Sequence, residues 1–207
     1  MLLWIIISHL FAGLILSFIG SLPFGLINIT TSKISIEKGI RAALWFALGA
    51  SIIELLQAFI SISFAGLLIK GSSLSNAFEW FSFTLFLVLG IYYLFFNKTK
   101  AAKENTKELK KGRLIISGIS VSALNFMVFP YWIFYFTYLK KQAILSFEYP
   151  MQLVFALGVG SGTFLLLWLY AVLGKKLMQR FSLVDRYINK VIGIIFIGLA
   201  VLTFLQI

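Results

Sequence analysis

The chain has 207 residues, of which 60% are hydrophobic and only 12% are charged, and its formal net charge is +11. Soluble domains carry about 25% charged residues, so this composition excludes an ordinary soluble domain and indicates an integral membrane protein. The basic residues lie in short loops between hydrophobic runs, which argues against the basic surface stripe of a nucleic-acid-binding protein.

Six hydrophobic segments are long enough to cross a bilayer, because about twenty apolar residues suffice for a transmembrane helix. In chain order they are Leu2–Ile29, Ala42–Ile69, Phe78–Phe96, Leu114–Leu139, Met151–Gly174 and Tyr187–Ile207. The first segment has no basic region before it and no small-residue cleavage site, so we expect a retained span rather than a signal peptide. The predicted fold class is an all-α integral membrane protein with six transmembrane helices.

Lysine and arginine are concentrated in alternate loops, namely those that follow the first, third and fifth spans. The richest of these loops is the segment 98–112 between the third and fourth spans. The positive-inside rule places the basic loops in the cytoplasm and both termini outside. We therefore expect a multi-pass protein of the cell (plasma or inner) membrane in contact with the lipid bilayer.

The orientation divides the single domain 1–207 into two halves, 1–97 and 113–207, of opposite topology, joined by the Lys-rich cytoplasmic loop 98–112. Inverted three-helix halves are a common transporter plan, with the substrate site at the midplane between them. Any protein with six spans divides in this way, so support for the plan requires a matching interruption in both halves.

Such interruptions occur in the first and fourth spans. The first contains Pro23, Gly25 and Asn28, and the fourth contains Asn125 and, later, Pro130. Proline removes a backbone donor and frees a carbonyl group one turn earlier, which in lipid needs protein, water or a ligand as its partner. Two interpretations stay open: ordinary kinks packed against neighbouring helices, or discontinuous helices that line a transport path.

If the helices line a path, each interrupting residue has a predicted role in substrate binding. The amides of Asn28 and Asn125 would offer hydrogen bonds, and the carbonyl groups freed by Pro23 and Pro130 would bind a substrate ammonium group. Gly25 would allow close approach of the backbone.

Glu54 is the acidic residue near the middle of the second span. A charge at the centre of a membrane helix costs about 2.5 to 3.5 kcal/mol, so it normally faces a cavity or a partner. Its helix face is polar or small and also carries Ser51, Gln57, Ala58 and Ser61. Glu54 could bind a cationic group such as an amino-acid ammonium, carry a proton, or be a structural residue hydrogen-bonded to Asn or Ser.

Other features favour packing over chemistry. Gly158 and Gly162 form a small-xxx-small pair that permits close helix contact, and no strand precedes them as a dinucleotide site would require. His9 has no second ligand nearby in the sequence, and cysteine is absent. No nucleophile and base stand in a catalytic arrangement. We therefore predict no enzyme activity, no cofactor and no metal site.

Aromatic residues cluster near the outer end of the fourth span, at Tyr131, Trp132, Tyr135 and Tyr138. Tyrosine and tryptophan are enriched where a transmembrane helix meets the lipid headgroups. We therefore expect these four side chains to form an interfacial belt.

Several of these residues resemble a known family. The segment Pro23-Phe24-Gly25-Leu26-Ile27-Asn28 is similar to the Pro- and Gly-containing break, followed by Asn, of the LysE-type (LysE/RhtB) amino-acid exporter family. Lys38–Ala50, a basic, Gly-containing loop that leads into an Ala-Leu-Gly step, also resembles it, as does Gly112–Asn125. Two positions depart from the family pattern: Asn125 is followed by Phe126 instead of Pro, and Ala50 stands where many members carry an acidic residue.

The resemblance implies a secondary transporter that exports amino acids or similar small metabolites and is driven by the proton gradient. Two alternatives remain: a transporter for cation or metal homeostasis, and a non-transporting membrane scaffold or assembly protein. A homodimer is compatible with so small a transporter, and the expected partner is a small-molecule substrate rather than nucleic acid.

Overall fold

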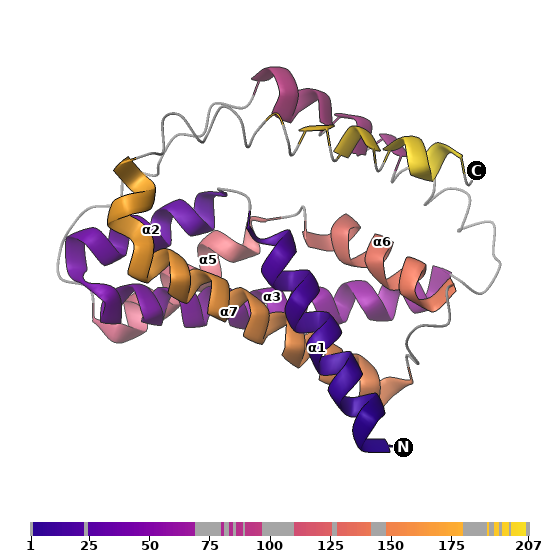
Figure 1. Cartoon of the computed structure of the whole chain (residues 1–207), viewed down its shortest axis with the longest axis horizontal. Coiled ribbons are helices and arrows are strands. Elements are labelled where there is room, and N and C mark those ends of the chain that lie inside the picture. The colour runs from indigo at the N-terminus through magenta and orange to yellow at the C-terminus, as the bar shows by residue number, and fades with distance from the viewer. Residues whose placement is uncertain are drawn as a thin grey trace.

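The chain is built of helices throughout the part that the computed structural model describes. That part comprises residues 2–22, 25–68, 80, 83–84, 86–88, 90–96, 110–125, 128–141, 148–179, 190, 193–194, 196–198 and 200–205. No strand occurs among these residues, which confirms the predicted all-α class. Figure 1 shows the labelled elements, which are α1 (Leu2–Gly20), α2 (Leu26–Lys38), α3 (Ile40–Leu68), the π-helical segment η1 (Tyr92–Phe96), α5 (Lys111–Ala123), α6 (Val128–Lys141) and α7 (Tyr149–Gln179).

Among the described residues, three helices are long and apolar enough to cross a membrane: Leu2–Gly20, Ile40–Phe64 and Tyr149–Gly174. Helices α5 and α6 together form a further candidate span, bent by 67° at a short break. These apolar helices identify a multi-pass membrane protein. The predicted spans Phe78–Phe96 and Tyr187–Ile207 lie partly outside the described residues.

The predicted first and fourth spans each consist of two helices rather than one. Within Leu2–Ile29 the chain forms α1, breaks after Gly20, and starts α2 at Leu26, which continues to Lys38. The predicted end of the first span at Ile29 rested on hydropathy alone. Hydropathy does not detect where one helix ends and another begins within an apolar run. Four polar residues of α2 are buried, namely Asn28, Thr30, Thr31 and Ser32, so the helix continues beyond the apolar stretch.

Glycines bring α1 and α7 into close contact. A Cβ atom added to Gly13 would collide with the backbone oxygen of Phe155, and one added to Gly158 would collide with that of Leu10. Gly162 packs in the same way against α1. The packing role predicted for Gly158 and Gly162 is therefore confirmed.

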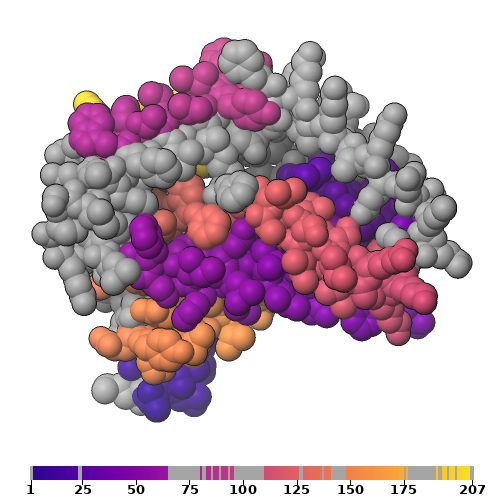
Figure 2. Space-filling model, turned by 180° about the vertical axis from the view of Figure 1, so that it is seen from behind, coloured from indigo at the N-terminus to yellow at the C-terminus, as the bar shows by residue number. Residues whose placement is uncertain are grey.

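Helices α3 and α5 make an equivalent contact, and Figure 2 shows them side by side on one face of the molecule. A Cβ atom on Gly118 of α5 would collide with the backbone oxygen of Phe46, and one on Gly49 of α3 would collide with that of Ile115. The backbones of both helix pairs thus touch, which fixes how the helices can cross.

The polar face of α3 points inward, as predicted. Ser51, Glu54, Gln57 and Ser61 are all buried, whereas Ile52, Leu56 and Ile60 are exposed on the opposite side. Because lipid would surround this helix, the arrangement turns the apolar residues to the bilayer and the polar ones to neighbouring helices.

The described parts of the segments 80–96 and 190–205 run side by side along the top of Figure 1. The rings of Phe86 and Phe196 stack with their centroids 6.1 Å apart, and Trp80 meets Phe204 edge to face at 6.5 Å. Phe196 also reaches the cavity described below.

Candidate functional site

The break between α1 and α2 is held by side chains of two helices. The Asn28 side-chain amide, in α2, donates to the backbone oxygen of Ser21 at 2.7 Å. The hydroxyl of Tyr170, in α7, donates to the backbone oxygen of Leu22, also at 2.7 Å. These two carbonyl groups at the break thus accept hydrogen bonds from the protein. The carbonyl group one turn before Pro23 is that of Ile19, and its oxygen accepts from the Leu22 N–H at 3.2 Å. Pro23 itself lies outside the described residues.

Gly25 stands at the start of α2 in an extended conformation, with φ −89° and ψ 172°. Having no side chain, it provides no cap for the first backbone N–H groups of the helix. The beginning of α2 lines the cavity described below through Gly25, Leu26 and Asn28. The first turn of α2 therefore forms part of the cavity wall.

The second break separates α5 from α6. It is built around Asn125, whose N–H donates to the backbone oxygen of Ser122 at 2.9 Å and whose backbone oxygen accepts from Val128 at 3.4 Å. Pro130 lies not at the break but in the first turn of α6. A first-turn N–H has no partner within its own helix, so proline costs little there and starts the helix rather than kinking it.

Glu54 lies between the two breaks, on the inner face of α3. Its side chain is buried, with 6% of its surface exposed. The Ser21 hydroxyl donates to the carboxyl oxygen Oε1 at 3.4 Å, and Thr163, in α7, lines the same cavity beside the carboxyl group. Thr163 in turn shares a 2.7 Å hydrogen bond with Ser17 of α1. The carboxyl group therefore lies where three helices meet.

One cavity of about 410 Å³ collects most of the predicted site residues. Gly25, Asn28, Glu54 and Asn125 all line it, although they come from different parts of the chain. Pro130 does not belong to its wall. The breaks and the buried carboxyl group thus meet at one place.

The cavity also contains residues that the sequence analysis missed or misplaced. Its polar wall includes Ser17, Ser21, Tyr131, Tyr135 and Thr163. A serine or threonine in a transmembrane helix carries no sign of its partner, because its hydroxyl group commonly bonds to its own helix. The sequence signal that existed was the proximity of Ser17 and Thr163 to glycines, which mark where helices approach closely.

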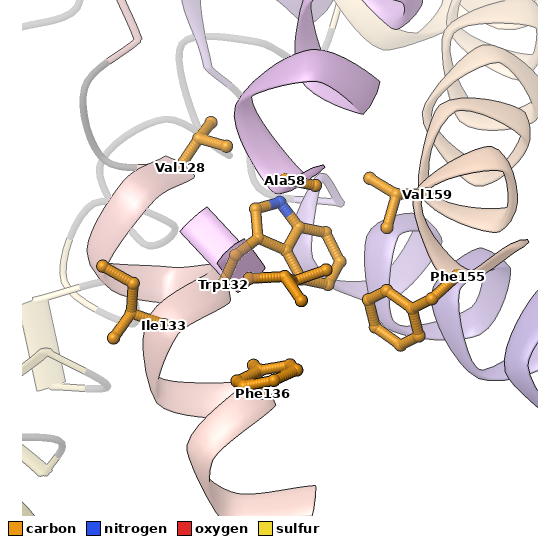
Figure 3. Packing of buried hydrophobic residues seen from close by; sticks show 8 residues of the cluster. Ala58, Val128, Trp132, Ile133, Phe136, Phe155 and Val159 are labelled. Atoms are coloured by element: carbon orange, nitrogen blue, oxygen red, sulfur yellow. The ribbon is translucent and has the colours of Figure 1, made fainter. Parts of the chain in front are cut away.

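The predicted interfacial belt is wrong for three of its members. Trp132 is 1% exposed and packs with Ala58, Phe155 and other apolar residues in the cluster of Figure 3. Tyr131 donates to the backbone oxygen of Leu16 at 2.8 Å and, like Tyr135, lines the cavity. Only Tyr138 of the four is exposed. The bend after α5 explains the difference, because it turns this face of α6 toward the bundle.

No group of three His, Cys, Asp or Glu side chains lies close enough to hold a metal ion within the described part of the chain. His9 is buried, and its Nδ1 atom lies 2.6 Å from the backbone oxygen of Ile5. The polar groups that line the cavity are the Glu54 carboxyl group, the amides of Asn28 and Asn125, and several hydroxyl groups.

Comparison with known proteins places this arrangement in a family. The searches of curated proteins and of solved structures give no match. A family model described as LysE type translocator matches residues 18–206, which includes both breaks, Glu54 and every residue of the cavity wall except Ser17. On this evidence the chain belongs to the LysE type translocator family.

Proposed function

We propose that the protein is a secondary transporter that exports amino acids or similar small metabolites by alternating access, coupled to protons. Membership of the family makes it a membrane exporter of small molecules. The observation that carries the finer proposal is the buried carboxyl group of Glu54 in the wall of a cavity between two helix breaks.

The size and polarity of the cavity suit an amino acid. Its volume of about 410 Å³ is near the lower end of ligand pockets, which span about 300–1,000 Å³. A carboxylate at Glu54 attracts an ammonium group, and the uncapped start of α2 favours a substrate carboxylate. A substrate with both groups would bridge Glu54 and the helix end.

The helix contacts support two inverted halves, 1–97 and 113–207. The glycine contact between α1 and α7 recurs between α5 and α3, with Gly13 matched by Gly118 and Gly158 matched by Gly49. The spacing along the chain is also the same in both helix pairs: Phe155 lies three residues before Gly158, and Phe46 lies three residues before Gly49.

The direction of the helices agrees with this plan. Gly13 contacts Phe155, and four residues later in α1 Ser17 contacts Thr163, which is also later in α7. Helices α1 and α7 therefore run parallel. The same holds for α5 and α3, from Gly118 with Phe46 to Ser122 with Gln57. A two-fold axis in the membrane plane would exchange the two pairs.

We further propose that all of 1–207 forms one transporter domain with six spans, in which the basic loops are cytoplasmic and both termini are outside. The charge pattern supports this orientation. Most of the loop 98–112 lies outside the described residues. A homodimer would place the exposed apolar faces of neighbouring subunits in contact within the bilayer.

The decisive experiment is an efflux assay. Cells that express the wild type, Glu54→Gln or the control Glu148→Gln are loaded with amino acids by feeding dipeptides, and each amino acid in the medium is followed over time. Glu148 is exposed before α7, so its variant should export like wild type. A hydrogen bond to a charged group contributes about 1.5–3 kcal/mol, so Glu54→Gln should lower export of the affected amino acids about tenfold or more.

Equal membrane abundance of the variants is the condition for this comparison. Export that survives Glu54→Gln would assign Glu54 a structural role and leave the exporter in place. Release of every amino acid at the rate of cells without the protein would remove amino acids as the substrate class.

A further inference from the structure

Three buried side-chain atoms have no hydrogen-bond partner among the described residues: the oxygen Oε1 of Gln57, the hydroxyl oxygen of Ser122 and the indole nitrogen Nε1 of Trp132. The first two belong to the contact between α3 and α5, and Gln57 lies three residues after Glu54 in α3. The Gln57 nitrogen Nε2 donates to the Ser122 backbone oxygen at 3.4 Å, so the two side chains are neighbours across α3 and α5. An unsatisfied buried polar atom costs about 1–3 kcal/mol, which suggests that another state of the protein supplies the partner.

Ser122 differs in this respect from other serines of the bundle. Ser51, Ser61 and Ser120 each donate to the backbone oxygen one turn earlier in their own helix, at 2.7–2.9 Å. This local bond is the usual solution for a serine within a membrane helix. Ser122 is completely buried and does not make it.

The matching helix contacts indicate which partner is missing. Ser17 follows Gly13 in α1 at the same interval as Ser122 follows Gly118 in α5. Thr163 follows Gly158 in α7 as Glu54 follows Gly49 in α3. Ser17 and Thr163 are hydrogen-bonded at 2.7 Å.

By this correspondence the natural partner of Ser122 is Glu54, whose side chain is instead turned toward Ser21 and Thr163. Gln57 lies one turn further along α3 on the same face as Glu54 and contacts Ser122, so the two unpaired atoms stand on the side of α3 to which the carboxyl group points.

We propose that Ser122 and Gln57 form a second docking position for the side chain of Glu54, which it occupies when protonated. A protonated carboxyl group has one O–H donor and retains acceptor capacity. It would donate to the Gln57 oxygen Oε1 and accept from the Ser122 hydroxyl, which satisfies both atoms at once. In the described position the carboxyl oxygen Oε1 accepts from the Ser21 hydroxyl, which is the role of an ionised carboxylate.

The surroundings leave Glu54 as the group that exchanges the proton. The other titratable groups among the described cavity-lining residues are the phenols of Tyr131 and Tyr135, both from α6. The lining residues from α1, α2, α5 and α7 are uncharged. The proton would enter from the water to which the cavity opens and would return to water when Glu54 moves back to Ser21.

This movement rests on the proposed export function for its use but not for its existence. Protonation would move the carboxyl group from the α1–α2 break to the contact between α3 and α5. This movement would couple protonation to the alternating-access change, in which the two halves swap conformations. Ser122 and Gln57 are thus positioning residues that act through Glu54.

The test is infrared difference spectroscopy of the purified protein in lipid during a pH titration. The carbonyl stretch of protonated Glu54 is identified as the band lost in Glu54→Gln. Removing a hydrogen bond to this carbonyl group moves its stretch to higher wavenumber, so Ser122→Ala should shift the band upward, and Gln57→Met should alter it by removing the acceptor of the O–H group. The control Ser120→Ala removes a hydroxyl group from the exposed face of the same helix and should leave the band unchanged.

A Glu54 band that ignores Ser122→Ala and Gln57→Met, or that responds only to Ser21→Ala, would overturn the proposal. If Gln57→Met fails to fold, Ser122→Ala decides alone, because it removes one atom that has no partner. The outcome is independent of transport. A shifted band without amino-acid export would remove the proposed substrate class and keep the docking position. Export with an unshifted band would keep the substrate class and remove the docking position.

Discussion

At the scale of single residues, the hydrogen bond between Ser17 and Thr163 joins α1 to α7 directly beside Glu54. Both hydroxyl groups are buried, so each needs a hydrogen-bond partner within the protein or the cavity. The bond therefore stabilises the helix pair and also presents Thr163 to the carboxyl group of Glu54.

Ser17→Ala should accordingly destabilise the protein, by about 0.6 kcal/mol and at most about 1.7 kcal/mol, the range measured for hydrogen bonds between membrane helices. Thermal unfolding in one detergent would measure the difference. Ser161→Ala is the matched control, because the Ser161 hydroxyl is exposed and bonds within its own helix. Ser122→Ala should not lower stability, because it removes a buried hydroxyl group that has no partner, and a loss as large as that of Ser17→Ala would show that Ser122 already has one.

At the scale of elements, the two glycine contacts determine how closely the helices approach. Gly118 faces the backbone of α3, and a backbone oxygen cannot rotate away as a side chain can. Gly112, in the first turn of the same helix, has no atom beyond its chain neighbours and the nearby backbone of its own helix within 4 Å of the position of an added Cβ.

Gly118→Ala should therefore force α5 away from α3 and lower stability by about 1–3 kcal/mol, as overpacking does. Gly112→Ala should be neutral or slightly stabilising, because alanine favours a helix more than glycine does. The unfolding midpoints of the two variants measure the contrast. Equal midpoints would mean that the helices α3 and α5 do not touch at Gly118.

At the scale of the whole molecule, the proposed orientation can be tested because the natural chain contains no cysteine. Single cysteines at the exposed positions Lys176 and Glu148 would report on opposite ends of α7. With the basic loops inside, a membrane-impermeant thiol reagent should label Glu148→Cys in intact cells and Lys176→Cys only after permeabilisation. Labelling in the opposite order would invert the topology.

The sequence predicted the features that depend on a residue and its near neighbours along the chain. Hydropathy indicated the membrane class, proline and glycine indicated the break between α1 and α2, and the helical period indicated that Glu54 shares a buried polar face with Ser51 and Gln57. The second break was predicted near the right place but attributed partly to Pro130, which starts α6. The difference arose because a proline is compatible with a helix start and a helix kink alike.

What the sequence by itself determined is that the chain is helical, crosses a membrane and carries a carboxyl group on an inward face. The tertiary structure alone decided which residues meet that carboxyl group. Trp132 and Tyr131 have the composition of an interfacial belt, yet the bend after α5 turns them into the core and the cavity. Ser17 meets Thr163, and Gln57 meets Ser122, across long separations in the chain. Hydropathy and helical period describe a helix in isolation, whereas these contacts depend on which helices pack together and in which direction they run.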